Sequence, residues 1–320
     1  MSDQFKNPPS AKLHGLGRDG VDRRGLLKCM AWAGAGVLWT VSGGVPRSMG
    51  LADAYADAMD GLSFVQISDT HMGFNKAANP HPDATMAEAV ARIRKLPTQP
   101  AFLVHTGDIT HLSKPAQFDM AAQIIKGANS QVHYIPGEHD WLDGGDAFKA
   151  HHGQGTKGDG WYSFDSHGVH FVALVNVVNF KAGSLTSIGQ DQLAWLKDDV
   201  SALSPSTPII VLAHIPLWAV YPKWGWGTED SAEALAILKR FGSVTVLNGH
   251  IHQVLQKVEG NVTFHTAMST AYPQPAPGAA PSPGPLKVPA DKLSSYLGIR
   301  EVNYVEGQSS LALVDTSLVA

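Results

Sequence analysis

The sequence predicts an α/β fold, a four-layer α/β/β/α sandwich in which two mixed sheets pack face to face beneath helices. Short apolar runs alternate with amphipathic stretches, and two pairs of neighbouring strand-like runs are joined by turns typical of hairpins. Hairpins add antiparallel strands to the parallel strands that helical crossovers produce, so each sheet is expected to be mixed. The chain has 320 residues, 44% of them hydrophobic, which suffices for one large domain with a sizeable core.

Five short runs rich in Val, Ile and Leu predict buried strands, because each ends at a polar or glycine turn. These runs are residues 62–67, 101–104, 131–135, 208–213 and 243–247. Between them, apolar residues at three- and four-residue spacing predict helices. The helices are expected at residues 85–96, 116–125, 190–200 and 231–241. Thr85 and Ser231 are the expected N-caps of the first and last of these helices.

The middle and the end of the chain add antiparallel strands and a long loop. Two hairpins are expected, formed by residues 161–165 with 169–175 and by residues 253–258 with 262–266. A final strand is expected at residues 310–314. Residues 273–290 are rich in Pro, Ala and Gly and predict an extended loop, which either lies on the surface or covers a site as a lid.

The first 58 residues have the character of an export signal. Arg23 and Arg24 lead into Gly-Leu-Leu-Lys and then into an uncharged run, residues 29–44, that is short for a bilayer span. This pattern resembles the twin-arginine signal, although a membrane anchor or a buried helix is the alternative. We expect residues 1–58 to be a signal peptide with a short linker, used by the twin-arginine translocase. The remainder, residues 59–320, is then a periplasmic or secreted domain that keeps no stable membrane anchor.

Charge and cysteine usage restrict the possible partners and ligands. The formal net charge is −4 and the isoelectric point is near 6.4, so the basic excess that binds nucleic acid is missing. The only cysteine, Cys29, lies within the predicted signal. A mature chain would therefore hold any metal through oxygen and imidazole nitrogen rather than through sulfur.

Five short motifs place Asp, Glu and His directly after predicted strands. They are Ser-Asp-Thr-His at 68–71, Thr-Gly-Asp at 106–108, Pro-Gly-Glu-His-Asp at 136–140, Ala-His-Ile-Pro at 213–216 and Asn-Gly-His-Ile-His at 248–252. Each motif alone is common and is compatible with a capped turn or a buried core histidine. Because loops at the carboxyl ends of strands converge in α/β proteins, the five motifs together predict one site.

This series of motifs resembles the calcineurin-like metallophosphoesterase family, whose pattern is DxH, GD, GNH(D/E), H and GHxH. The resemblance runs from Ser68 to His252 and implies a metallophosphoesterase domain over residues 59–320. It implies two metal ions of the kind that suit carboxylate and imidazole ligands, namely Fe, Mn or Zn. By this resemblance, the first ion is held by Asp69, His71 and His252, the second by Glu138, His214 and His250, and both by Asp108.

The same resemblance implies a reaction. A hydroxide that bridges the ions would attack the phosphorus of a small-molecule phosphate ester, and His139 would protonate the leaving oxygen as general acid. Asp140 would orient the His139 ring and raise its basicity. The alternative for His139 is a purely structural hydrogen bond. A phosphodiester is the expected substrate, and the alternatives are a phosphomonoester or a non-catalytic, metal-dependent binding module.

Glu138 departs from the family pattern, which has asparagine at this position. Glutamate is one methylene longer and carries a negative charge, so it cancels about one unit of positive charge at the site. Three outcomes are open: a second metal with altered preference, a metal displaced by the changed geometry, or a site that binds without turnover. We expect Glu138 to be a genuine ligand, because oxygen still occupies the position and the other ligands are present.

Two further groups of residues have weaker signals. His111 lies on the turn after Asp108, where a surface or capping role is favoured over contact with substrate. An aromatic cluster follows His214 on a loop that contains Gly and Pro, and it predicts either a pocket for a flat group or a local hydrophobic plug. Its members are Trp218, Tyr221, Trp224 and Trp226.

Overall fold

The computed structural model describes residues 37–42, 45–50, 61–304 and 311–319. The chain divides into two compact units, 1–37 and 38–320, and the second contains almost everything described. Strands β1 (Val37–Ser42) and β2 (Val45–Gly50) pair as a small sheet of their own. The predicted twin-arginine motif lies outside the described residues, so the export signal stays a prediction. Within the described ranges, no helix has the length and apolar content needed to cross a bilayer.

The first large sheet has five strands. Its order is β13 (Leu311–Ser317), β12 (Gly298–Tyr304), β3 (Leu62–Ile67), β4 (Leu103–Thr106) and β5 (Val132–Ile135). The last three strands are parallel to one another, whereas β12 is antiparallel to both of its neighbours. The carboxyl ends of β3, β4 and β5 therefore meet along one edge.

The second large sheet has six strands. Its order is β10 (Gln256–Glu259), β11 (Val262–Thr266), β9 (Val244–Asn248), β8 (Ile209–Leu212), β7 (Val169–Ala173) and β6 (Tyr162–Ser166). The four central strands are parallel and the two outer strands are antiparallel to their neighbours. The outer strands come from the two predicted hairpins, and the prediction of two mixed sheets is confirmed.

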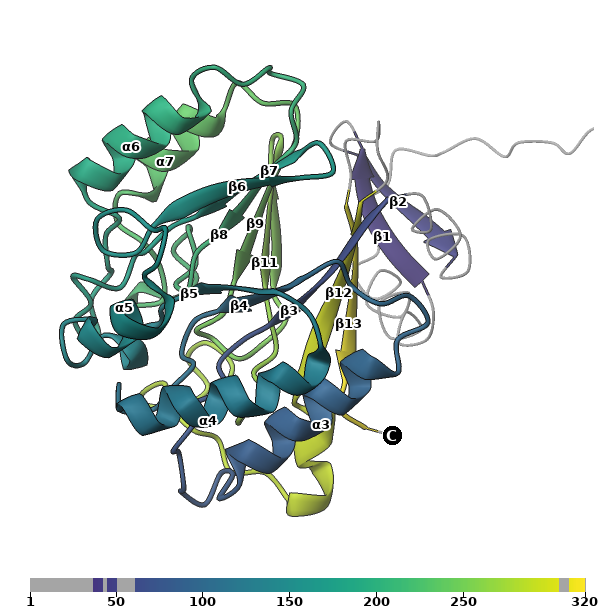
Figure 1. Ribbon diagram of the computed structural model, residues 1–320, viewed down its shortest axis with the longest axis vertical. Coiled ribbons are helices and arrows are strands. Elements are labelled where there is room, and N and C mark those ends of the chain that lie inside the picture. The colour runs from purple at the N-terminus through teal and green to yellow at the C-terminus, as the bar shows by residue number, and fades with distance from the viewer. Residues whose placement is uncertain (1–36, 43–44, 51–60, 305–310, 320) are drawn as a thin grey trace, which may run out of the picture. The chain divides into compact units, whose positions relative to one another are not determined.

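The layers can be followed in Figure 1, and three apolar cores hold them together. One lies between the sheets, where Phe64 and Val104 of the first sheet pack with Phe171 and Leu212 of the second. A second core joins the first sheet to helices α3 (Pro82–Arg94), α4 (Pro115–Ile125) and α5 (Asp146–His152). A third joins the other sheet to α6 (Gln190–Val200) and α7 (Ser231–Leu238). The predicted α/β/β/α sandwich is therefore the observed fold.

Short 3₁₀ turns complete the secondary structure of the described residues. They are η2 (Lys126–Ala128), η3 (Glu138–Asp140), η4 (Pro222–Trp224) and η5 (Ala290–Ser295). Residues 273–289 contain neither helix nor strand, as the composition of this segment predicts.

Both predicted N-caps are wrong. Helix α3 begins three residues before Thr85, because Pro82 has the fixed backbone angle that favours a first helical position. The Thr85 hydroxyl lies inside the helix and donates to the Pro82 carbonyl. Helix α7 has Asp230 at its N-cap, and Ser231 is its first residue. The Asp230 carboxylate accepts from the backbone amides that lead into α6, at residues 188 and 189, so it holds the two helices together.

Candidate metal centre

The five motifs meet at the carboxyl ends of the central strands of both sheets. Asp69 and His71 follow β3, Asp108 follows β4, and Glu138 follows β5. From the second sheet, His214 follows β8, and His250 and His252 follow β9. Hydrogen bonds join the loops across the two sheets; for example, the His250 backbone amide donates to the Asp69 side chain at Oδ1 over 3.1 Å.

One cluster of ligand atoms consists of Asp69, His71 and His252, whose side chains are all buried. The His252 Nε2 atom lies 3.2 Å from Asp69 Oδ1 and 3.3 Å from His71 Nε2. The other nitrogen of His252, Nδ1, donates to the Tyr272 carbonyl at 2.6 Å and so directs Nε2 inward. These are the residues that the sequence assigns to a first ion.

A second cluster consists of Glu138, His214 and His250. The Glu138 carboxylate lies 2.9 Å from His214 Nε2 and 3.0 Å from His250 Nδ1. His214 Nδ1 donates to the Thr106 carbonyl at 2.6 Å, which fixes the orientation of its ring. The longer side chain of glutamate therefore reaches the two imidazoles that the sequence assigns to a second ion.

Asp108 lies between the two clusters. Its Oδ2 atom is 3.4 Å from His71 Nε2 in the first cluster and 3.5 Å from His214 Nε2 in the second. Its Oδ1 atom accepts the His139 backbone amide at 2.9 Å, which leaves Oδ2 for both clusters. This is the position that a bridging carboxylate requires.

The residues present fit a pair of metal ions. His214 Nε2 is buried and faces Glu138 at 2.9 Å, yet it has no hydrogen-bond partner. A buried polar atom without a partner is costly, and a cation between nitrogen and oxygen would satisfy both. Imidazole nitrogen and carboxylate oxygen also form the donor set for borderline divalent ions. These buried clusters are consistent with a dimetal site.

The pKa shifts in the second cluster also agree with a cation site. Burial alone would raise the pKa of Glu138, but the His250 and His214 rings outweigh it and hold that pKa well below its usual value. Burial would lower the pKa of His214, but the carboxylates of Asp108 and Glu138 raise it well above its usual value. Glu138 is therefore a carboxylate at neutral pH, the form that binds cations.

Backbone strain is concentrated at this site. Five of the seven predicted ligands have left-handed backbone angles, which side chains other than glycine rarely adopt. They are Asp69 (φ 54°), His71 (φ 42°), Asp108 (φ 50°), His250 (φ 69°) and His252 (φ 54°). Such residues cost about 1–3 kcal/mol each and cluster where function requires them. The surrounding sheets thus hold the ligands in orientations that the local chain does not favour.

Three motif glycines are required by close packing against these ligands. A Cβ on Gly107 would lie 2.4 Å from His214 Nδ1, and one on Gly137 would lie 2.1 Å from Asp108 Oδ1. At Gly249, a Cβ would lie 2.6 Å from Asp69 Oδ2 and 2.1 Å from the Ser68 hydroxyl. The glycines therefore let one ligand loop approach another, a reason that their place in the motif does not reveal.

His139 lies beside the clusters with one ring nitrogen engaged. Its Nδ1 donates to the His111 carbonyl at 2.8 Å, and its ring stacks on the His111 ring with centroids 4.7 Å apart. The ring also lies edge-on to His71, and His139 lines the cavity described below. The Nε2 atom is therefore the nitrogen available to a ligand in that cavity.

The prediction that Asp140 raises the basicity of His139 agrees with the pKa of His139, which burial lowers but the carboxylates of Asp108, Glu138 and Asp140 raise overall. The predicted orienting role needs correction, because the Asp140 carboxylate hydrogen-bonds to other groups. It accepts from the Ile109, Thr110 and Gly137 backbone amides at 2.9, 2.7 and 3.0 Å, and from the Thr110 hydroxyl at 2.8 Å. These four bonds saturate both oxygens, so Asp140 ties the β4 loop to the β5 loop. The carbonyl of His111, which no side-chain motif marks, takes the orienting position instead.

His111 and Tyr272 are site residues that sequence reasoning underrated or missed. His111 Nδ1 lies 3.4 Å from His71 Nδ1, and the ring lines the cavity rather than serving only as a surface or capping group. The Tyr272 hydroxyl lies 3.1 Å from His71 Nε2, and its ring stacks on the His71 ring at 4.8 Å. His111 could be found by its place three residues after Asp108, but Tyr272 follows β11 in a segment without a recognisable motif.

A cavity of about 370 Å³ opens onto both clusters. Phe180, Trp224 and Trp226 line it, together with Lys76 and residues 283–285 of the Pro-rich loop. The predicted aromatic cluster divides here, since Trp218 instead packs on Phe264 of β11 with ring centroids 5.1 Å apart. The Pro-rich loop contributes part of the wall, whereas Pro277, Pro281 and Pro289 of the same segment are exposed.

Comparisons with known proteins identify relatives among phosphatases and phosphoesterases. The calcineurin-like phosphoesterase family matches residues 62–254. Over 95 residues the chain is 32% identical to purple acid phosphatase 15 from Arabidopsis thaliana, covering 29% of this chain and 17% of that protein. Over 184 residues it is 23% identical to serine/threonine-protein phosphatase CPPED1 from Danio rerio, covering 52% of this chain and 58% of that protein.

A solved structure shows the same fold. The dimetal phosphatase from Danio rerio is 13% identical, with a TM-score of 0.61, and the match covers 81% of this chain and 97% of that one. The chain spans less than two thirds of the two curated relatives it matches. The family match itself covers more than half of the chain and includes all five motifs. This chain therefore belongs to the calcineurin-like phosphoesterase family.

Proposed function

We propose that the protein is a dimetal phosphodiesterase that hydrolyses a small-molecule phosphate ester. The observation that carries this proposal is the pair of buried clusters joined by Asp108, with His139 beside them. Asp69, His71 and His252 would hold one ion, Glu138, His214 and His250 the other, and Asp108 both. When bound, the ions would supply positive charge that stabilises the phosphoryl oxygens and lowers the pKa of water.

The side chains around the clusters bind and position the substrate. The His111 carbonyl and the Asp108 carboxylate fix His139 through its ring and its backbone amide, at 2.8 and 2.9 Å. With Nδ1 engaged, His139 Nε2 can give a proton to the leaving oxygen as the bond from phosphorus to oxygen breaks. Loss of such a general acid lowers rates by about 10²–10⁴-fold, so His139→Ala should lose activity while it keeps its metal.

Glu138 favours a diester over a monoester on electrostatic grounds. Two divalent ions against three carboxylates leave about one net positive charge, whereas asparagine at this position would leave about two. A phosphomonoester is close to a dianion at neutral pH, because its second pKa is about 6, and a diester is a monoanion. The lower site charge therefore penalises the monoester more than the diester.

The test compares bis(4-nitrophenyl) phosphate with 4-nitrophenyl phosphate on protein loaded with Mn or Fe. We expect a higher kcat/KM for the diester. Glu138→Gln removes the charge and keeps the length, and Glu138→Asn restores the residue of the family pattern. Both variants should raise monoester activity relative to diester activity by about tenfold or more, since one unit charge at 4 Å is a large effect even at an effective dielectric of about 20. A faster monoester reaction that neither variant alters would overturn the diester proposal.

We also propose that the protein is exported in folded form to the periplasm or the exterior. The support is the paired arginines and the uncharged run that follows them. Metal loading before export is compatible with a ligand set that contains only oxygen and nitrogen.

A further inference from the structure

The cavity has two chemically different walls. His71, His111 and His139 form an imidazole wall beside the first cluster, with ring centroids 4.7 to 5.5 Å apart. Phe180 and Trp226 belong to an aromatic wall beside the second cluster, and their centroids lie 6.2 and 6.4 Å from the His250 ring. A substrate centred on the two clusters therefore meets imidazole rings, with His139 among them, on one side and apolar surface on the other.

The aromatic wall is fixed in place before any ligand binds. Trp224 and Trp226 are 6% and 1% exposed and pack edge to face at 4.9 Å. Both rings belong to one apolar cluster with Ile251, which lies between the ligands His250 and His252. Gly225 adopts a left-handed backbone angle in this turn, and a Cβ there would meet the Ser184 carbonyl at 2.6 Å. The wall and the ligand loop are thus one packed unit.

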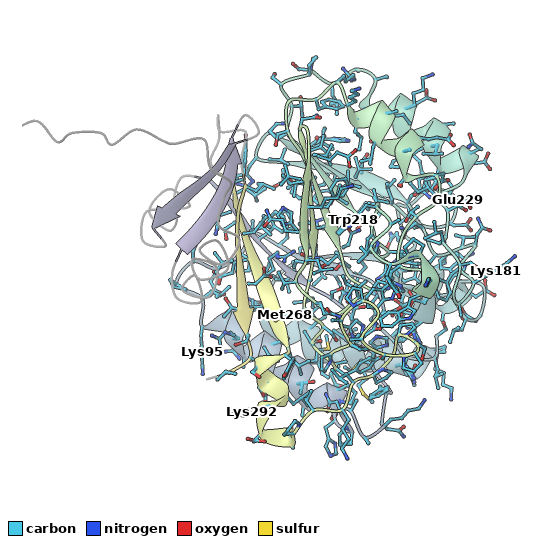
Figure 2. All side chains as sticks on the ribbon, turned by 180° about the vertical axis from the view of Figure 1, so that it is seen from behind. Lys95, Lys181, Trp218, Glu229, Met268 and Lys292 are labelled. Atoms are coloured by element: carbon cyan, nitrogen blue, oxygen red, sulfur yellow. The ribbon has the colours of Figure 1, made fainter. Side chains whose placement is uncertain are left out.

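Phe180 completes the wall from a second loop. It packs against Val175, Val177 and Ile215, and Ile215 directly follows the ligand His214. Unlike the two tryptophans, Phe180 is only partly buried, so its ring presents free surface to the cavity. The neighbouring Lys181 is exposed, does not line the cavity and points outward in Figure 2.

We infer that Phe180, Trp224 and Trp226 form an apolar subsite for the ester group that remains on phosphorus, so the substrate is a diester with an aromatic or otherwise apolar retained group. This inference rests on the proposed function. In an in-line displacement the attacking and leaving oxygens lie opposite each other, and the retained ester group projects to the side. With His139 at the leaving oxygen, the aromatic wall is the surface that can bury the retained group and exclude water from it.

The bond changes define which group the subsite holds. Water oxygen forms a bond to phosphorus, the bond from phosphorus to the leaving oxygen breaks, and that oxygen keeps the electron pair. His139 gives the leaving oxygen a proton and regains one from the attacking water. The products are one alcohol or phenol and one phosphomonoester, and the monoester carries the group bound at the aromatic wall.

The test uses two diesters with the same leaving group. Bis(4-nitrophenyl) phosphate and methyl 4-nitrophenyl phosphate both release 4-nitrophenol, but they retain an aryl and a methyl group respectively. In metal-loaded protein, Phe180→Ala should raise KM for the bis-aryl diester on the order of tenfold and leave KM for the methyl diester within about twofold. Phe180→Leu should show a smaller effect, and Lys181→Ala is the matched control from the same loop. Equal effects on both substrates would place Phe180 at the leaving group and overturn the inference.

A binding measurement separates this inference from the proposed function. Diphenyl phosphate and dimethyl phosphate differ only in the groups on phosphorus, and calorimetry with metal-loaded protein measures their affinities without turnover. We expect diphenyl phosphate to bind at least about tenfold more tightly, and Phe180→Ala to remove most of that preference. If the protein binds diphenyl phosphate more tightly but hydrolyses no diester, the proposed function is refuted and the subsite stands. Equal affinities for the two ligands would refute the subsite whatever the catalytic result.

Discussion

Substituting Gly137 by alanine tests whether the close approach of two ligand loops builds the metal centre. Gly137 has an ordinary backbone angle, so alanine meets no conformational barrier there. The obstacle is space. A Cβ would lie 2.1 Å from Asp108 Oδ1, 2.7 Å from its Cγ and 2.3 Å from its backbone nitrogen. One of these atoms is backbone, so rotation of the Asp108 side chain cannot relieve the contact.

The size of the required movement can be taken from these distances. Separation of the Cβ from Oδ1 must increase from 2.1 Å to at least 3.0 Å, a movement of about 0.9 Å. Metal–ligand distances vary by only about 0.2 Å, so a shift of this size removes Asp108 from its bridging position. The same movement strains the bond from the His139 amide to Asp108 Oδ1. Overpacking of this kind also costs about 1–3 kcal/mol of stability.

We therefore expect Gly137→Ala to lose at least one of two bound ions and to lower kcat/KM by about 10–100-fold or more. Metal content is measured by mass spectrometry of the purified protein, activity with bis(4-nitrophenyl) phosphate, and stability by urea unfolding. Gly242→Ala is the control, because the nearest atom to a Cβ there is the Pro205 carbonyl oxygen at 3.8 Å. It should retain both ions. A Gly137→Ala protein with two ions and the original rate would refute the packing argument.

Three further predictions concern other parts of the chain. His111→Ala should lower kcat about tenfold with metal content retained, because it removes the ring stacked on His139, as steady-state kinetics and metal analysis would show. His170 lies between Asp165 and Asp199 at 2.8 and 2.9 Å, and although burial lowers its pKa, these carboxylates raise it overall. In urea unfolding, His170→Gln should therefore be most destabilising below about pH 6.5, with the difference lost as pH rises through the raised pKa. Arg23→Lys with Arg24→Lys should keep the protein in the cytoplasm on cell fractionation, and unchanged export would refute the signal.

The predictable part of the fold was the part whose burial pattern is local. Helix α6 has the predicted bounds and the central strands lie within about two residues of theirs, because each is a short apolar run between polar turns. Strand β12 was missed because Arg300, Glu301 and Asn303 interrupt its apolar pattern, yet it lies inside the five-stranded sheet, between β13 and β3. The Arg300 guanidinium bonds the Asp315 carboxylate at 2.8 Å. This ion pair offsets the cost of burying Arg300. Because Asp315 is 15 residues away in the sequence, a local apolar pattern cannot reveal the pair.

Helix α5 was missed for a different reason. It has only seven residues, and it follows Gly144 and Gly145, which signal a loop. Its buried residues, Ala147 and Phe148, pack into the core under α4, so tertiary contact rather than length stabilises it.

The candidate site also has one part that could be predicted from the sequence and one part that depends on tertiary packing. Side chains that follow parallel strands meet at one edge, so the convergence of the motif residues follows from chain order and sheet geometry. The misassigned partner of His139 has another cause: sequence adjacency suggested Asp140, but the 3₁₀ turn from residue 138 to 140 directs that carboxylate toward backbone amides. The bond from His139 to the His111 carbonyl depends on how two loops pack, and a backbone acceptor leaves no signature in residue type.

The residues expected to carry the reaction lie in sequence motifs, whereas the residues that would select the substrate do not. The chemistry requires a fixed set of oxygen and nitrogen atoms at the strand ends, and short motifs are enough to specify them. The other cavity-lining groups come instead from Phe180, from Trp224 and Trp226, and from residues 283–285, on three loops that no motif constrains. These loops also pack on the ligands, since the Phe180 and Trp226 rings lie 6.2 and 6.4 Å from the His250 ring and Gln274 donates to the His250 carbonyl at 2.7 Å. Glu138 belongs to both sets under the proposed function: it stands in a motif, and its charge would act on the choice between a dianionic and a monoanionic ester.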